Sequence, residues 1–179
     1  LIGDILELSR AMRMGGRKEE IPLADVVAEV LTGMQSRIKE LHATVRIGGD
    51  LPRLRVDRFW ISQAVYNLLS NALKFTNEGE APNVEIEPYQ PLDREPRMSG
   101  LVVRDRGTGV PEELRERIFL LFQRGVGRNI DGTGAGLAIV REIAARHGGR
   151  AWMRPRAGGG SDFVLTVSNG SNGDSSHEP

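Results

Sequence analysis

Apolar residues recur along this chain with two different spacings, and these spacings predict where its helices and strands lie. Steps of three and four residues predict helices over residues 1–14, 23–41, 58–76, 111–124 and 137–147. Short alternating or β-branched runs predict strands over residues 44–47, 54–56, 84–86, 101–105, 151–153 and 163–167. A turn at Gly48-Gly49-Asp50 is expected to return the chain, so that strand 54–56 pairs with strand 44–47.

The two ends of the chain have patterns that differ from the middle. The first helix carries an apolar stripe with few other residues to bury it, formed by Leu1, Ile5, Leu8 and Met12. This helix either packs on its own domain or is the end of a dimerising helix whose beginning lies upstream. Residues 17–21 read as a charged linker, and residues 169–179 are small and polar, as in a disordered tail. We expect one folded domain over residues 22–168.

Composition narrows the setting and the partners of the chain. Lys plus Arg and Asp plus Glu both number 24, so no overall charge favours nucleic acid, and we expect no nucleic-acid partner. The absence of cysteine excludes disulfides and thiolate chemistry and is compatible with a reducing compartment. No apolar run approaches the roughly 20 residues that span a bilayer. We therefore expect a cytoplasmic location, whether or not the parent protein is anchored in a membrane.

The helix over residues 58–76 carries two stripes with different chemistry. One stripe is apolar and consists of Ile61, Val65, Leu68 and Ala72. The other aligns Asn67, Asn71 and Lys74, although two asparagines cost a helix roughly 1 kcal/mol relative to alanine. This second stripe is either a solvated polar face or a binding face. In the latter case the carboxamide oxygens suit magnesium and the lysine suits phosphate.

Two further segments combine glycine with a group that binds ligands. Asp105 ends a strand and is followed by Gly107 and Gly109, which allow the backbone to approach a ligand closely. Its carboxylate can accept a hydrogen bond from an exocyclic amine, or it can simply form an Asx-turn. The run Gly132-Thr133-Gly134-Ala135-Gly136 opens the last helix, where free amides favour an anion such as phosphate. It is neither a Walker A loop nor a dinucleotide fingerprint.

The order and spacing of these segments resemble the ATP-binding domain of sensor histidine kinases, over roughly residues 22–168. The residues that carry the resemblance are Asn67, Asn71 and Lys74, then Asp105, Gly107 and Gly109, then Phe119 and Phe122, then Gly132, Gly134, Gly136 and Leu137. That family belongs with gyrase, heat-shock chaperone and mismatch-repair ATPases. The resemblance implies an α+β fold, a two-layer α/β sandwich of the Bergerat type with a mixed sheet packed on three helices. It also implies Mg²⁺ and ATP as ligands.

The resemblance also implies roles for individual residues. Asn71 would bind magnesium, with Asn67 orienting the ion or its waters, and Lys74 would contact phosphate. Asp105 would accept from the adenine amino group, with Gly107 and Gly109 at close approach. In the lid, Phe119 and Phe122 would serve as anchors and Arg124 could reach the phosphates. Backbone amides of the last glycine-rich segment would also bind nucleotide, from Thr133, Gly134, Gly136 and Leu137.

This chain departs from the family pattern in two ways. The family usually has Glu-Pro between the two phenylalanines, where this chain has Leu120-Leu121. A histidine kinase needs an acceptor histidine on a helical hairpin, and none of His42, His147 and His177 has such a context, so we expect no autophosphorylation of this chain alone. We expect the hairpin of the same parent, a response-regulator receiver domain and a homodimeric parent as partners.

Two other functions are alternatives to phosphoryl transfer to histidine. A hydrolysing relative would want a carboxylate at position 67, and Asn67 cannot act as a base. A non-catalytic regulatory module, in which nucleotide only sets conformation, would keep every binding residue.

Overall fold

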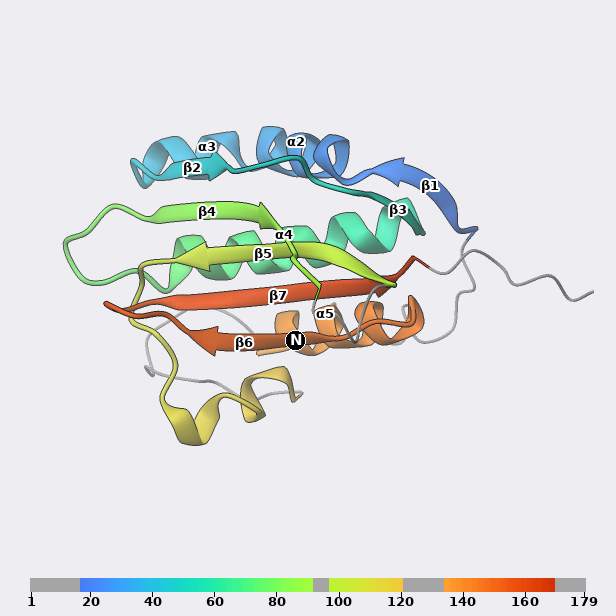
Figure 1. The fold of residues 1–179 in the computed structure, drawn as a ribbon. Coiled ribbons are helices and arrows are strands. Elements are labelled where there is room, and N and C mark those ends of the chain that lie inside the picture. Colours follow the sequence, from blue (N-terminus) through green and yellow to red (C-terminus); the bar gives the residue numbers. More distant parts are fainter. Residues whose placement is uncertain (1–16, 92–96, 121–133, 170–179) are drawn as a thin grey trace, which may run out of the picture.

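The fold is a mixed five-stranded sheet with helices on one face, seen in a computed structural model that describes residues 17–91, 97–120 and 134–169 (Figure 1). The strands of this sheet are β2 (Thr44–Ile47), β4 (Asn83–Pro88), β5 (Met98–Asp105), β6 (Ala151–Pro155) and β7 (Ser161–Ser168). Their order is β2-β4-β5-β7-β6; β2 and β4 are parallel and the other pairs are antiparallel. The α+β fold with a mixed sheet, predicted from the resemblance, is confirmed.

The helices cover one face of this sheet and enclose the main core. They are α2 (Leu23–Gly33), α3 (Gln35–Glu40), α4 (Arg58–Lys74) and α5 (Gly136–Arg146). In Figure 1, α4 and α5 run behind the sheet, with α2 and α3 beside them at the top. Within the described ranges, no helix combines the length and the apolar character needed to cross a bilayer.

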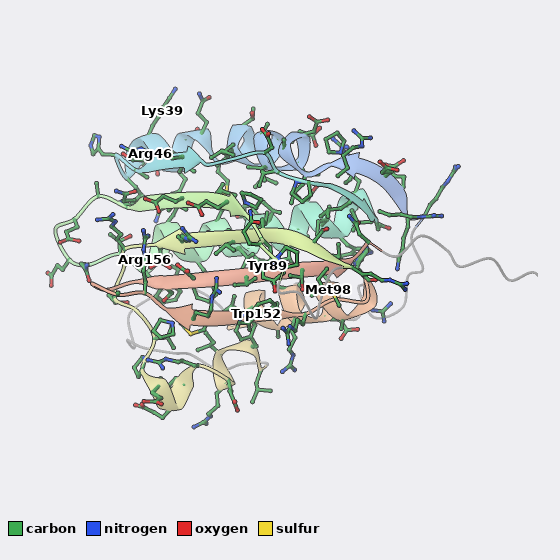
Figure 2. All side chains as sticks on the ribbon, viewed as in Figure 1. Lys39, Arg46, Tyr89, Met98, Trp152 and Arg156 are labelled. Carbon is green, nitrogen blue, oxygen red and sulfur yellow. The ribbon has the colours of Figure 1, made fainter. Side chains whose placement is uncertain are left out.

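The opposite face of the sheet has a small apolar cluster of its own. Strand alternation turns Val102 and Val164 to this face, where Tyr89, Met98 and Trp152 pack against them. Figure 2 shows the last three side chains over the open face. The rings of Tyr89 and Trp152 meet edge to face, with centroids 5.6 Å apart. This cluster covers part of the outer face, on which no helix of the described residues packs.

Three elements differ from the sequence-based predictions. The predicted helix over residues 23–41 is two helices, because Met34 leaves helical geometry between α2 and α3. Strand β3 (Arg53–Val56) does not return along β2; it pairs with β1 (Glu19–Pro22) in a separate two-stranded sheet. The predicted helix over residues 111–124 is, as far as it is described, two short 3₁₀ turns, η1 (Glu112–Leu114) and η2 (Arg117–Phe119).

The boundaries of the folded unit are also wider than predicted. Residues 17–21 were expected to be a linker, but Glu19–Pro22 form β1, and the Lys18 ammonium donates to the Arg146 carbonyl at 3.1 Å. At the other end Asn169, assigned to the tail, donates from its backbone to the Arg97 carbonyl at 2.8 Å. The rest of that tail and the predicted first helix lie outside the described residues.

Candidate functional site

Helix α4 presents the Asn-bearing stripe next to the core. Asp57 caps its start as predicted, since the Asp57 carboxylate accepts from the Trp60 backbone N–H at 3.3 Å. The apolar stripe of the helix is buried, whereas Asn67, Asn71 and Lys74 are partly exposed along one side. At the end of the helix, the Lys74 ammonium lies 5.0 Å from the centroid of the Phe75 ring. The polar stripe therefore lies at the edge of the core, not on a fully solvated face.

Asn67 meets the start of α5, which lies far away in the sequence. A Cβ placed on Gly136, the first residue of α5, would lie 3.3 Å from the Asn67 Oδ1 atom. The Asn67 Nδ2 atom is buried and has no hydrogen-bond partner among the described residues. A buried amide without a partner is costly in a folded protein, so this atom is a candidate ligand contact. The structure thus brings together two of the predicted site segments.

Asp105 ends β5 with its side chain buried and held by the backbone. Its Oδ1 atom accepts from the Gly107 N–H at 2.8 Å and from the Ser161 N–H at 3.2 Å. No hydrogen bond from a described residue reaches Oδ2. The carboxylate is therefore fixed in direction, with one oxygen left to accept from a ligand.

Burial also sets the charge balance at Asp105. Burial raises the pKa of the Asp105 carboxyl above its ordinary value, while the two backbone hydrogen bonds and the nearby Arg156 guanidinium act in the opposite direction. Arg156 itself pairs with Glu85 at 2.9 Å on the outer face of the sheet. A buried carboxyl with a perturbed pKa beside glycine-rich backbone is typical of a functional site.

Gly107 and Gly109, which follow Asp105, are required for different structural reasons. A Cβ on Gly107 would lie 1.8 Å from the Phe75 carbonyl oxygen at the end of α4, so only glycine fits there. The Thr108 N–H donates to that same carbonyl at 3.1 Å. Gly109 has a φ of +70°, which disfavours other residues. The loop after β5 is thus attached to the end of the Asn-bearing helix.

Sequence reasoning missed the turn between β6 and β7. Ser161 donates its backbone N–H to Asp105, and a Cβ on Gly160 would lie 2.1 Å from the Asp105 carbonyl oxygen. This turn and Gly107 therefore bind the same carboxylate oxygen of Asp105. The run Gly158-Gly159-Gly160 before Ser161 was the available signal, because three successive glycines between strands indicate close backbone approach.

The remaining predicted residues divide into described and undescribed positions. Gly134 has a φ of +75°, and Leu137 packs against the core at the start of α5. Phe119 is buried and its ring lies 6.4 Å from that of Phe163. Phe122, Arg124 and Thr133 lie outside the described residues, so their predicted roles in the lid and at the phosphates stay predictions.

Comparisons with known proteins agree with this geometry. Residues 56–170 match the family model described as "Histidine kinase-, DNA gyrase B-, and HSP90-like ATPase". The methanogenesis regulatory histidine kinase FilI of Methanothrix harundinacea is 33% identical over 167 residues, which are 93% of this chain and 18% of FilI.

Two solved structures share the fold. The catalytic domain of histidine kinase ThkA superposes with a TM-score of 0.70 at 29% identity, covering 84% of this chain and 97% of that domain. Full-length ShkA in complex with AMPPNP superposes with a TM-score of 0.75 at 27% identity, covering 93% of this chain and 34% of ShkA.

The extent of these matches fixes what they identify. The chain spans 18% of the length of FilI and 39% of the length of another curated relative, the adaptive-response sensory kinase SasA of Prochlorococcus marinus. It therefore corresponds to one part of each of them. That part is the catalytic domain, because the match covers 97% of the isolated ThkA catalytic domain. The chain belongs to the family of histidine kinase-, DNA gyrase B- and HSP90-like ATPases, as the ATP-binding catalytic domain of the sensor histidine kinases of two-component systems.

Proposed function

We propose that this domain binds ATP with magnesium, recognises adenine through Asp105, and donates the γ-phosphoryl group to a histidine on a helical hairpin of its parent protein. The observation that carries the proposal is the buried Asp105 carboxylate. Two backbone N–H groups fix its Oδ1 atom, and no described residue binds Oδ2. An acceptor held in this way matches the amino group of adenine and mismatches the carbonyl oxygen of guanine.

Residues of α4 and α5 would hold the phosphates. The carboxamide of Asn71 suits magnesium, and Asn67 would orient the ion or its waters through its oxygen. Its Nδ2 atom, which has no partner among the described residues, would donate to a phosphate oxygen. Lys74 would contact phosphate, together with backbone amides at Thr133, Gly134, Gly136 and Leu137. Magnesium, when bound, neutralises phosphate charge. The remaining task of the protein is to position the phosphates and exclude water, with Phe122 and Arg124 of the lid assisting.

The chemistry of Asn67 supports transfer over hydrolysis. A carboxamide cannot take a proton from water, so this position lacks the general base that a hydrolysing relative would use. His147 is a poor acceptor, because it is 5% exposed and both ring nitrogens contact backbone groups. The phosphoryl acceptor would therefore be a histidine elsewhere in the parent protein.

The partners and location follow from the same proposal. We propose a homodimeric parent protein, because the hairpin of such kinases is also the dimerisation element. The histidine would pass its phosphoryl group to a response-regulator receiver domain; the related kinase ThkA has been crystallised in complex with the response regulator TrrA. We place the domain in the cytoplasm, where ATP and a receiver domain are available, whether or not the parent is membrane-anchored.

Calorimetric titration of ATP and GTP with magnesium tests the adenine contact. The unaltered chain should bind ATP more tightly than GTP. Asp105→Asn should lose about 1.5–3 kcal/mol of ATP binding free energy, roughly a 10- to 150-fold loss of affinity, because an amide donor replaces a charged acceptor. Asp162→Asn is the matched control, since Asp162 pairs with Arg104 and Arg154 on the outer face. Equal ATP affinity in the parent and Asp105→Asn, with the same preference over GTP, would refute the adenine contact.

Transfer is tested by supplying the hairpin as a separate chain. With [γ-³²P]ATP and magnesium, label should appear on the hairpin as an acid-labile phosphohistidine, and none should appear on this chain alone. Substitution of the hairpin histidine by glutamine is the control that should abolish labelling. Release of inorganic phosphate with an unlabelled hairpin would overturn transfer in favour of hydrolysis. Tight ATP binding with neither product would favour the regulatory alternative.

A further inference from the structure

His147 joins α4 and α5, the two helices of the proposed nucleotide site, at their ends remote from that site. It follows α5 as the C-terminal cap residue and is 5% exposed. Its Nε2 atom lies 3.0 Å from the backbone nitrogen of Asp57, the residue that caps the start of α4. Its Nδ1 atom lies 2.7 Å from the Ile143 carbonyl oxygen within α5. One imidazole therefore connects the start of α4 to the end of α5.

These two contacts fix the protonation state of the ring. A carbonyl oxygen only accepts and a backbone N–H only donates, so Nδ1 must carry the proton and Nε2 must be bare. The neutral ring with its proton on Nδ1 satisfies both partners. A second proton on Nε2 would set two donors against each other at 3.0 Å and remove the link to α4.

The surroundings of the ring favour this neutral form. Two charged groups shift the pKa of the ring: the Lys18 ammonium, from the segment before β1, and the Asp57 carboxylate, at the start of α4. Burial lowers the pKa of His147, with Lys18 acting in the same direction and Asp57 in the opposite one. The Arg146 guanidinium is directed to Glu142 at 2.8 Å, and β7 contributes the uncharged Ser168 N–H, which donates to the His147 carbonyl.

The same junction receives the incoming chain. Lys18 donates to the Arg146 carbonyl, one residue before His147, and β1 places Glu19 opposite Val56, one residue before Asp57. Three segments thus meet at the imidazole: the chain before β1, the start of α4 and the end of α5. The site lies at the start of α5, where Gly136 meets Asn67 from the middle of α4, and along the second half of α4.

We propose that neutral His147 is a positioning residue for nucleotide binding, which fixes α4 against α5, and that its protonation loosens this junction and weakens Mg-ATP binding. The inference rests on the proposed function for its ATP readout. A hydrogen bond of this kind contributes enough to change affinity by roughly threefold to tenfold if it is fully coupled to the site. The change would occur below pH 6.5, the ordinary pKa of histidine, because burial lowers the value here.

Two amide variants separate the two contacts of the ring. The carboxamide oxygen of His147→Gln reaches the Nε2 position and can accept from Asp57 without titrating. The shorter His147→Asn can donate to Ile143 but does not reach Asp57. We expect the ATP affinity of the unaltered chain to fall on acidification by more than the ATP affinity of His147→Gln does. The ATP affinity of His147→Asn should be low at every pH. Protonation of ATP itself affects all three proteins alike and cancels in the comparison.

Nuclear magnetic resonance of the parent chain gives a readout that needs neither variants nor nucleotide. The His147 ring should report the tautomer protonated at Nδ1, and its titration below pH 6.5 should coincide with faster exchange of the Asp57 amide. If this occurs but no protein binds ATP, the proposed function fails while the junction stands. Identical pH profiles of ATP affinity in the parent and His147→Gln would overturn the positioning role. So would a ring that titrates without any change at the Asp57 amide.

Discussion

The two ends of the proposed nucleotide site are built in opposite ways. At the adenine end, the Asp105 carboxylate accepts hydrogen bonds from the backbone N–H groups of Gly107 and Ser161, and the neighbouring backbones are too close to admit a Cβ at Gly107 or Gly160. At the phosphate end, Asn67 and Gly136 meet, and the Asn67 Nδ2 atom is buried without a partner among the described residues. The proposed adenine contact is therefore built into the backbone structure of the fold, whereas the proposed phosphate end keeps a buried polar atom that no described residue binds.

This difference has a consequence for mutation. At the adenine end, a change in shape must disturb the backbone, so folding and binding should be lost together. At the phosphate end, a side chain added at Gly136 would contact only the carboxamide at the end of the Asn67 side chain, which can move. Binding should therefore be lost while folding persists. Such a separation between stability and function is common where polar groups are left unsatisfied at a site.

The largest effect is expected for Gly107→Ala. The new Cβ would lie 1.8 Å from the Phe75 carbonyl oxygen, which also accepts from Thr108 and cannot rotate away. We expect a loss of about 3 kcal/mol or more in the free energy of unfolding, measured by urea denaturation, since overpacking against backbone exceeds the usual 1–3 kcal/mol.

Gly33→Ala is the matched control for that substitution. Gly33 is exposed at the end of α2 with nothing within 4 Å of a new Cβ, so alanine should be neutral or stabilise by up to about 1 kcal/mol. Gly107→Ala with the stability of this control would show that the loop after β5 is not clamped to α4.

The same substitution at the phosphate end, Gly136→Ala, should spare the fold. Its Cβ would meet the Asn67 Oδ1 atom at 3.3 Å, and that carboxamide can shift by a few tenths of an ångström. We expect stability within about 0.5 kcal/mol of the parent, with Mg-ATP affinity reduced about tenfold because Asn67 is displaced. Denaturation and calorimetry on one protein sample measure both. A variant that unfolds would mean that Asn67 is as rigid as Asp105.

A substitution at the N-cap of α4, away from both ends of the proposed nucleotide site, shows how large a purely structural effect on stability is. Asp57→Ala removes the carboxylate that accepts from the Trp60 N–H, and we expect about 1 kcal/mol of lost stability in urea denaturation. The Asp57 backbone N–H to His147 remains, so nucleotide affinity at neutral pH should stay within twofold of the parent. A larger loss of affinity would mean that fraying of the first turn of α4 reaches the nucleotide site.

The sequence predicted the phosphate end better than the contacts that hold the adenine end. Spacing alone aligned Asn67 and Asn71 on one side of a helix, because helical periodicity is a local property. The sequence also singled out Asp105 with its glycines, whose role in adenine binding stays a prediction. It could not show that Ser161 holds Asp105, because that contact joins strands distant in the chain.

The errors in the fold have the same origin. Residues 54–56 were predicted to pair with the preceding strand, yet they pair with Glu19–Pro22, whose charged sequence resembles a linker. The break at Met34 was missed because α2 and α3 continue one apolar pattern across it. Local pattern gives element type, whereas pairing depends on contacts that close only in the folded chain.

The smallest change in stability is expected for Asp105→Asn, and its sign depends on pH. The asparagine oxygen can still accept from Gly107 and Ser161, so the fold keeps both hydrogen bonds. Burial raises the pKa of Asp105, so the folded parent binds a proton more readily than the unfolded chain does. That contribution is fully present below the ordinary value of 3.8 and is lost as pH rises through the folded-state pKa.

Asp105→Asn has no such loss, so its stability relative to the parent should increase through this pH window and then stay constant to neutral pH. Urea denaturation at a series of pH values measures the difference, with Asp25→Asn, at an exposed position in the first turn of α2, as the control that should not gain in this way. A variant that instead becomes less stable on approach to neutral pH would mean that the Asp105 charge stabilises the fold. The carboxylate would then be a structural group rather than an acceptor kept for adenine.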